Sequence, residues 1–127
     1  SVQLVPLRIG LKTDIQDITF LGDKTKIHSK SKPALDELIN FLITNPELKV
    51  NIIGHVNGPD RLYSKNFYKE ASLMRSKAVV DYLVESGIDK GRLKAKGAGN
   101  EEMIYPNPVP DWQSEANRRI EIEIVEM

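Results

Sequence analysis

The segment from Arg119 to Ile124 alternates charged and aliphatic side chains, with isoleucine at every second position. Successive side chains of a β-strand point to opposite faces of the sheet. The period of two therefore predicts a strand with one apolar face against a core and one polar face in water. A chain with such a strand needs a second layer that covers the apolar face, and this need constrains the rest of the fold.

A first helix is predicted after Ser31. Ser29 and Ser31 can cap a helix N-terminus, and Pro33 suits a first helical turn. Asn45-Pro46 ends the helix, because a residue that precedes proline avoids helical backbone angles. The apolar residues recur at the i, i+3, i+4, i+7 spacing of one buried stripe: Leu35, Leu38, Ile39 and Leu42.

A second helix is predicted from about Asn66 to Glu85. Gly87 suits the position just past its end, and Ile88 can make the closing apolar contact. The side chains expected on one side of this helix are Ala71, Arg75, Ala78, Val79, Tyr82 and Leu83.

The remaining apolar runs predict strands and an arm. Val2–Leu11 indicates an edge strand or extended arm, and Ile15–Phe20 a short strand. Leu48–Ile53, ending at Gly54, and Leu93–Lys96 predict core strands, and a long proline-containing loop precedes the last strand. The expected fold is α+β: a two-layer α/β sandwich whose mixed four-stranded sheet has the order β-α-β-α-β-β, with the helices on one face. Residues 1–17 are expected to be an N-terminal strand or arm that belongs to the same domain as residues 18–127.

Composition excludes several function classes. The 127 residues carry 18 basic and 18 acidic side chains, whereas nucleic acids and anionic membranes require a dense cationic surface. There is no cysteine and there are two histidines, so thiol chemistry is excluded and a zinc site is not expected. No apolar run reaches the roughly 20 residues that span a bilayer. The abrupt start at Ser1 leads us to expect a domain cut from a longer protein.

The motifs from Gly54 onward resemble those of OmpA-like domains, which include peptidoglycan-associated lipoproteins and flagellar stator proteins. The resemblance covers about Ile18 to Val125, and its order and spacing make it specific. The matching segments are Gly54-His55-Val56-Asn57, Ala71-Ser72-Leu73-Met74-Arg75-Ser76, Val79-Val80-Asp81-Tyr82-Leu83, Gly87-Ile88, Arg92-Leu93, Gly97-Ala98-Gly99-Asn100 and Asn117-Arg118-Arg119-Ile120-Glu121-Ile122.

The resemblance implies a non-catalytic domain that binds the diaminopimelate of the peptidoglycan stem peptide. It would anchor an outer-membrane protein or lipoprotein to the wall, in the periplasm of a Gram-negative bacterium. By position, Arg75 would hold a carboxylate and Asn57 would face the ammonium, where the family usually has an aspartate. Asp23 and Arg118 fall where the family also lines its site, and Asp60 or Asp23 could supply the missing carboxylate. No cofactor or metal and no membrane contact by the domain itself are expected; other envelope proteins are further possible partners.

Other interpretations stay open. The loop between Asn57 and Arg75 is longer than usual for the family, and Tyr68 replaces a common asparagine. The domain could therefore be a protein-interaction module with weakened or lost peptidoglycan binding. An enzyme would need a nucleophile–base pair or paired carboxylates, which no motif provides. His55 is expected to be a structural histidine. Tyr63, Phe67 and Tyr68 could pack the long loop or form a patch that stacks against sugars.

Overall fold

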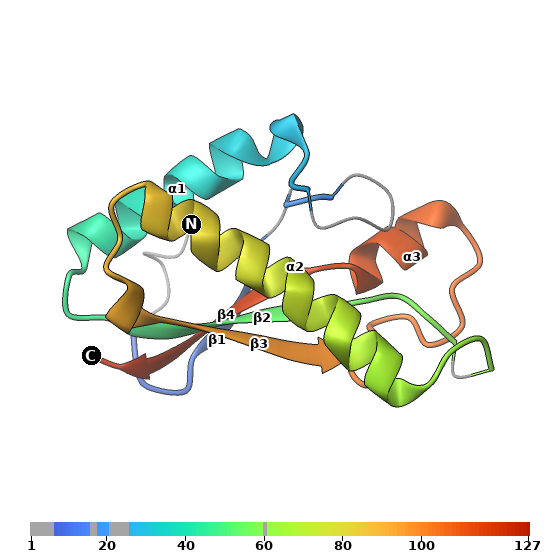
Figure 1. The fold of residues 1–127 in the computed structure, drawn as a ribbon. Coiled ribbons are helices and arrows are strands. Elements are labelled where there is room, and N and C mark those ends of the chain that lie inside the picture. The colour runs from blue at the N-terminus through green and yellow to red at the C-terminus, as the bar shows by residue number, and fades with distance from the viewer. Residues whose placement is uncertain (1–6, 16–17, 21–25, 60) are drawn as a thin grey trace.

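A computed structural model describes residues 7–15, 18–20, 26–59 and 61–127. In this part of the chain four strands form one sheet in the spatial order β1 (Lys12–Ile15), β4 (Ile120–Glu126), β2 (Lys49–His55), β3 (Leu93–Gly99) (Figure 1). β2 and β3 run parallel, whereas β4 is antiparallel to both of its neighbours. The predicted mixed four-stranded sheet is confirmed.

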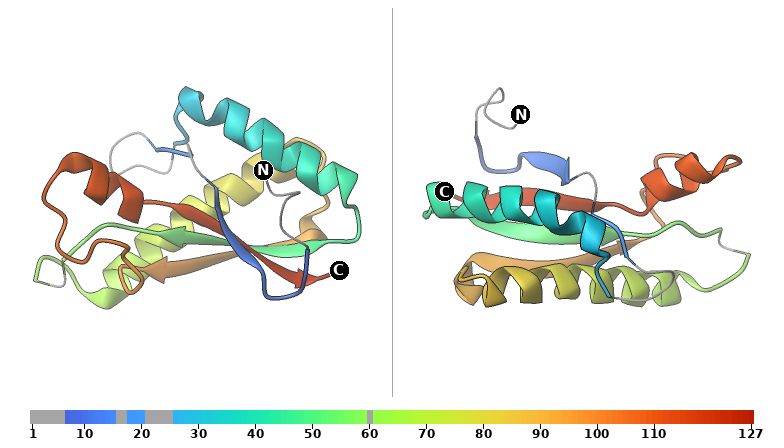
Figure 2. Two further views of the ribbon diagram at one scale, coloured as in Figure 1. Left: turned by 180° about the vertical axis from the view of Figure 1, so that it is seen from behind. Right: turned by 90° about the horizontal axis from the view of Figure 1, so that it is seen from above.

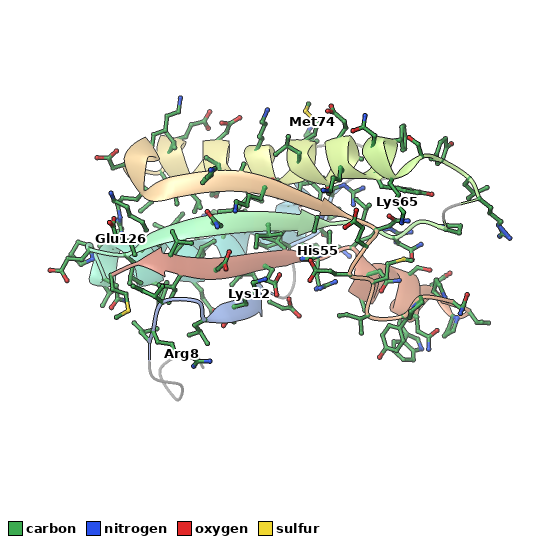
Figure 3. The ribbon with its side chains drawn as sticks, turned by 90° about the horizontal axis from the view of Figure 1, so that it is seen from below. Arg8, Lys12, His55, Lys65, Met74 and Glu126 are labelled. Carbon is green, nitrogen blue, oxygen red and sulfur yellow. The ribbon has the colours of Figure 1, made fainter. Side chains whose placement is uncertain are left out.

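Two long helices, α1 (Lys32–Thr44) and α2 (Lys65–Glu85), cover one face of this sheet, as Figures 1 and 2 show. The opposite face carries no helix among the described residues, and Figure 3 looks onto it. Two short 3₁₀ turns, η2 (Ser29–Ser31) and η3 (Lys90–Arg92), precede α1 and β3. The two-layer architecture agrees with the prediction.

The apolar core lies between the sheet and the two helices. The three alternating isoleucines of β4 are at most 5% exposed, and they lie opposite Val50, Ile52 and Gly54 of β2. Full burial of such a side chain contributes about 1.5–3 kcal/mol, so this layer is a main source of stability. The helices cover it with Leu35, Leu38 and Leu42 of α1 and with Val79 and Leu83 of α2.

The ends of α2 follow local sequence signals. The Ser64 hydroxyl accepts a hydrogen bond from the Phe67 amide at 3.1 Å and caps the first turn. At the other end, Gly87 has a φ of 103° and donates to Val84 O, while Ile88 donates to Leu83 O, both at 3.0 Å. This pair of bonds is a Schellman motif, and it needs a residue without a Cβ at position 87. The predicted role of Gly87 is confirmed.

Ser31 stands at the N-cap position of α1, but its hydroxyl does not cap the helix. It accepts from the Thr19 amide at 2.8 Å and donates to the Thr19 carbonyl at 3.2 Å. Ser31 is fully buried, so this pair of bonds fixes the segment before α1 onto the helix start. At the other end of α1, the Asn45 side chain donates to Phe41 O at 2.9 Å, where the prediction ends the helix.

The prediction for the N-terminal part was wrong in detail. Among the described residues the first strand is Lys12–Ile15. Of the predicted strand Ile15–Phe20, residues 16–17 lie outside the described part, and Phe20 makes only an isolated bridge to Ile27. β4 decides this placement, because Thr13 and Ile15 pair with Ile122 and Ile120 and add their side chains to the core face. Of the predicted arm, residues 1–6 lie outside the described part, and residues 7–11 are not a strand.

Three further predictions need correction. Leu93–Lys96 belongs to a longer strand that continues to Gly99 and lies at the sheet edge. The buried side of α2 contains Ser72 and Ser76, whereas the prediction had placed Ala71 and Ala78 there. The reason is the close approach of the helix to the sheet at Ser72: a Cβ added to Gly54 or Gly97 would lie within 3 Å of Ser72 or its neighbours. A third helix, α3 (Asp111–Asn117), was missed, because seven residues beside three prolines carry almost no helical periodicity.

Candidate functional site

The parallel strands β2 and β3 end at the same edge of the sheet, where β4 begins and where α3 lies (Figure 1). Loops that follow the carboxyl ends of parallel strands are the usual place for binding sites, because the rigid strands position them. The candidate site is built from the loop after β2 (residues 56–59), the neighbouring part of α2, and the junction of α3 with β4.

Asn57 is held by a side chain that the sequence interpretation did not single out. The Asn117 amide donates to Asn57 Oδ1 at 2.8 Å and to Tyr105 O at 2.8 Å, and its own oxygen accepts from Tyr105 N at 2.8 Å. Asn117 is fully buried, so it ties the β2 loop to the loop before α3. Its place at the start of the Asn-Arg-Arg motif was the only sequence signal for it.

The rest of the loop is fixed by contacts from three elements. Val56 donates to Gly99 O at 3.0 Å, the Asn100 amide donates to Gly58 O at 2.7 Å, and the Tyr68 hydroxyl donates to Pro59 O at 2.9 Å. A Cβ on Gly58 would lie 2.1 Å from the Tyr68 ring, so the ring packs directly on the loop backbone. Tyr68 therefore has a clear structural role here.

Arg75 lies on the buried side of α2 and is 8% exposed. Its guanidinium carbon is 5.1 Å from the centroid of the Phe20 ring, a cation–π contact. The planar guanidinium carries five N–H donors, an arrangement that suits hydrogen bonds to a carboxylate. Arg75 and Asn57 are thus held by different neighbours, Phe20 and Asn117.

The two arginines before β4 differ. Arg118 follows the last turn of α3 and is exposed, and among the described residues it makes no polar side-chain contact that would occupy it. Arg119 donates to Asp14 Oδ1 at 3.2 Å and to Glu102 O at 3.0 Å, so it is used in joining β1 and the β3–α3 loop to β4. Because Arg119 is engaged in these contacts and Arg118 is exposed, Arg118 is the better candidate for contact with a ligand. The other two predicted site residues, Asp23 and Asp60, lie outside the described residues.

His55 is closed to solvent at the end of β2. Its side chain is 1% exposed, and Nε2 lies 3.1 Å from Glu121 Oε1 (Figure 3 labels His55). Burial is the largest influence on the pKa of His55 and lowers it, the positive charge of Arg119 lowers it further, and Glu121 opposes both. The imidazole is therefore neutral at pH 7 and out of reach of a substrate, as expected for a structural histidine.

No helix within the described ranges has the length and apolar character to cross a membrane. The same ranges contain no group of three or more histidine, aspartate or glutamate side chains that could hold a metal ion.

Comparisons of sequence place this domain among segments of larger proteins. Outer membrane protein A of Klebsiella pneumoniae is 29% identical over 116 residues, which cover 85% of this chain and 33% of that protein. Outer membrane porin F of Pseudomonas aeruginosa is 29% identical over 109 residues, covering 85% and 30%. A segment of photosystem I P700 chlorophyll a apoprotein A2 of Gloeobacter violaceus is 31% identical over 114 residues, covering 86% and 13%. The chain thus spans less than half the length of each.

Solved structures share the fold. The periplasmic domain of Helicobacter pylori MotB superposes with a TM-score of 0.76 at 17% identity, covering 95% of this chain and 76% of that one. The peptidoglycan-associated lipoprotein from Burkholderia pseudomallei gives a TM-score of 0.69 at 17% identity, covering 87% and 88%. Residues 19–118, which include Arg75, Asn57 and Arg118, match the sequence model of the OmpA family. This chain therefore belongs to the OmpA family.

Proposed function

We propose that this domain binds the stem peptide of peptidoglycan without catalysis, in the periplasm, and so anchors an outer-membrane protein or lipoprotein to the cell wall. The family match across residues 19–118 is the observation that carries the proposal. One structural neighbour is by its name a peptidoglycan-associated lipoprotein.

Diaminopimelate carries carboxylates and an ammonium, so its site needs a cation and an acceptor. Arg75 carries a planar set of N–H donors, a geometry that suits two parallel hydrogen bonds to a carboxylate. Asn57 Oδ1 has a second lone pair beyond the one that accepts from Asn117, and this can accept from the ammonium. The exposed Arg118 is a further contact for a carboxylate. Asp23 and Asp60 remain candidates for the missing negative charge.

Asn57 predicts a weaker interaction than an aspartate would give, since a neutral hydrogen bond is about half as strong as a charge-assisted one. Weak binding by one domain is sufficient for anchoring, because the wall presents the same ligand many times and the effective concentration is high.

The test is a calorimetric titration with a diaminopimelate-containing muropeptide. Arg75→Lys keeps the charge but removes the planar fork, and we expect it to weaken binding at least about tenfold, or roughly 1.4 kcal/mol. Lys77→Ala changes an exposed cation on the same helix and serves as the matched control. Asn57→Asp keeps an acceptor for Asn117 and is expected to tighten binding roughly fivefold. Equal affinities of wild type and Arg75→Lys would remove Arg75 from the site.

A protein-interaction module is the second candidate, and exposed apolar side chains on the loop before α3 and in the first turn of α3 favour it. Ile104, Val109 and Trp112 are 49%, 88% and 58% exposed, although large apolar side chains are usually covered. Sedimentation with purified sacculi separates the two functions. If the wild-type domain stays in the supernatant while it retains a protein partner, the interaction module is the better description.

A further inference from the structure

Two exposed aromatic rings lie where the segment after β2 meets α2: Tyr63 precedes the helix and Phe67 is in its first turn. Tyr63 is 55% exposed and Phe67 is 49% exposed, yet their rings stack with centroids 4.3 Å apart and an interplanar angle of 19°. Each ring therefore covers one face of the other, which leaves the outer faces open. We call this pair the aromatic ledge.

The ledge is fixed although it is exposed. The Tyr68 ring meets Tyr63 edge-on at 6.0 Å and Phe67 edge-on at 5.8 Å, while Tyr68 itself is only 5% exposed. Tyr68 also packs on Gly58 and donates to Pro59 O, so the same side chain holds both the ledge and the loop that carries Asn57. The ledge is therefore a rigid continuation of the candidate site.

An open aromatic face in a fixed position, surrounded by polar groups, suits a sugar ring. The C–H groups on one face of a pyranose pack on the ring face, while its hydroxyl and N-acetyl groups stay free to bond to neighbours such as Lys65. Lys65 begins α2, two residues before Phe67. An anionic membrane fits less well, because the exposed side of α2 also carries Glu70 and Asp81.

The distance along α2 between the ledge and Arg75 is similar to the distance in peptidoglycan between the sugar and the diaminopimelate of its stem peptide. Phe67 and Arg75 are eight residues apart, a rise of about 12 Å at about 1.5 Å per residue. In peptidoglycan, diaminopimelate is the third residue of a stem that a lactyl group joins to the sugar. An extended chain of that length reaches about 10 Å at about 3.3–3.6 Å per residue. Tyr68 and Arg75 are also seven residues apart and so lie on nearly the same side of the helix.

We propose that Tyr63 and Phe67 form a carbohydrate-binding subsite that stacks on an N-acetylated amino sugar of the glycan strand, next to the stem peptide held at Arg75. The inference rests on the proposed function. It also offers a role for the segment between Asn57 and Arg75, because the ledge lies within that segment.

The experiment uses two probes: glycan strands freed of their peptides by an amidase, and the free diaminopimelate-containing stem peptide. The double variant Tyr63→Leu/Phe67→Leu keeps apolar side chains but removes both ring faces. We expect it to bind the glycan roughly tenfold more weakly than wild type, in keeping with the energy of aromatic stacking contacts. Its affinity for the free peptide should be unchanged.

Two controls accompany the double variant. Tyr63→Phe keeps the ring and is expected to bind the glycan as wild type does. Trp112→Leu removes a 58% exposed aromatic ring elsewhere on the molecule and should leave glycan binding unchanged. Thermal unfolding and circular dichroism of each variant check that the fold persists, which we expect because both ledge rings are half exposed.

The outcomes separate the two proposals. If the wild type fails to bind the free peptide, the proposed anchoring site is wrong, and the glycan titration still decides the ledge. Absence of glycan binding by the wild type, or equal glycan binding by the double variant, would overturn the subsite. So would ring-dependent sedimentation with anionic phospholipid vesicles in place of the glycan, which would make the ledge a membrane contact.

Discussion

Replacing Asn117 with alanine tests whether one buried amide holds the rim of the site together. Asn117 is fully buried and makes three hydrogen bonds of 2.8 Å, one to Asn57 and two to Tyr105. A buried polar group that loses its partner costs about 1–3 kcal/mol. Asn57 and Tyr105 are half-buried, so water can reach them in part and the lower value applies to each bond. We therefore expect a loss of about 3 kcal/mol in the free energy of unfolding.

The assay is urea unfolding of purified Asn117→Ala, with thermal unfolding as a second measurement. For a domain of this size, about 3 kcal/mol corresponds to a fall of roughly 10 °C in Tm. Amide hydrogen exchange at Tyr105 should also become faster, because its N–H donates to Asn117 Oδ1. Asn107→Ala, on the exposed part of the same loop, is the control and should change stability by less than about 0.5 kcal/mol.

Asn117→Asp sharpens the test because it keeps the size of the side chain. A carboxylate still accepts from Tyr105 N, but it has no proton to donate and would face Asn57 Oδ1 and Tyr105 O. We expect it to destabilise the domain at neutral pH at least as much as alanine does. If both variants unfold within about 0.5 kcal/mol of wild type, the amide does not hold the rim and the reasoning is refuted.

Three further predictions concern other parts of the fold. Burial lowers the pKa of His55, so folding favours the neutral form of its imidazole. The stability that this group contributes is complete above the ordinary pKa of 6.5. It is lost as the pH falls from 6.5 through the lower pKa of the folded state. Urea unfolding between pH 7.5 and 5 should show this slope in wild type and in His28→Asn but not in His55→Asn, and an unchanged slope in His55→Asn would contradict it. The Arg92 guanidinium donates to Leu48 O at 3.0 Å and to Leu42 O and Asn45 O at 2.8 Å. Arg92→Ala should therefore lower the free energy of unfolding by about 2–3 kcal/mol in urea. Arg118→Ala changes an exposed side chain and should lower it by less than about 0.5 kcal/mol, and equal effects would disprove the role of Arg92. A Cβ on Gly54 would lie 2.2 Å from Ser72 O, whereas a Cβ on Gly91 would meet only Asp89 Oδ1 at 3.4 Å. Gly54→Ala should therefore lower the free energy of unfolding by about 2 kcal/mol or more in chemical denaturation. Similar stability of Gly54→Ala and Gly91→Ala would refute the close packing of α2 on β2.

The order of predicted helices and strands led to the correct fold, and the family resemblance led to Arg75 and Asn57 as residues of interest, but neither revealed how these two side chains are held. Asn117 was visible only as part of a motif, because its role depends on Asn57, 60 residues earlier in the chain. The sugar-stacking interpretation of Tyr63 and Phe67 was one of two that the sequence left open. It gained weight only when the two rings were found stacked and half exposed.

Local periodicity in the sequence by itself determined the elements whose signals repeat within a few residues. The alternation through Ile124 specifies β4, the leucine stripe specifies α1, and Gly87 specifies the end of α2, since each pattern follows from the geometry of one strand or helix. Contacts between distant residues are not encoded in such patterns. Only the tertiary structure decided that Lys12–Ile15 is the first strand, that Ser72 faces the sheet glycines, and that Asn117 binds Asn57, because each depends on which segments pack together in space.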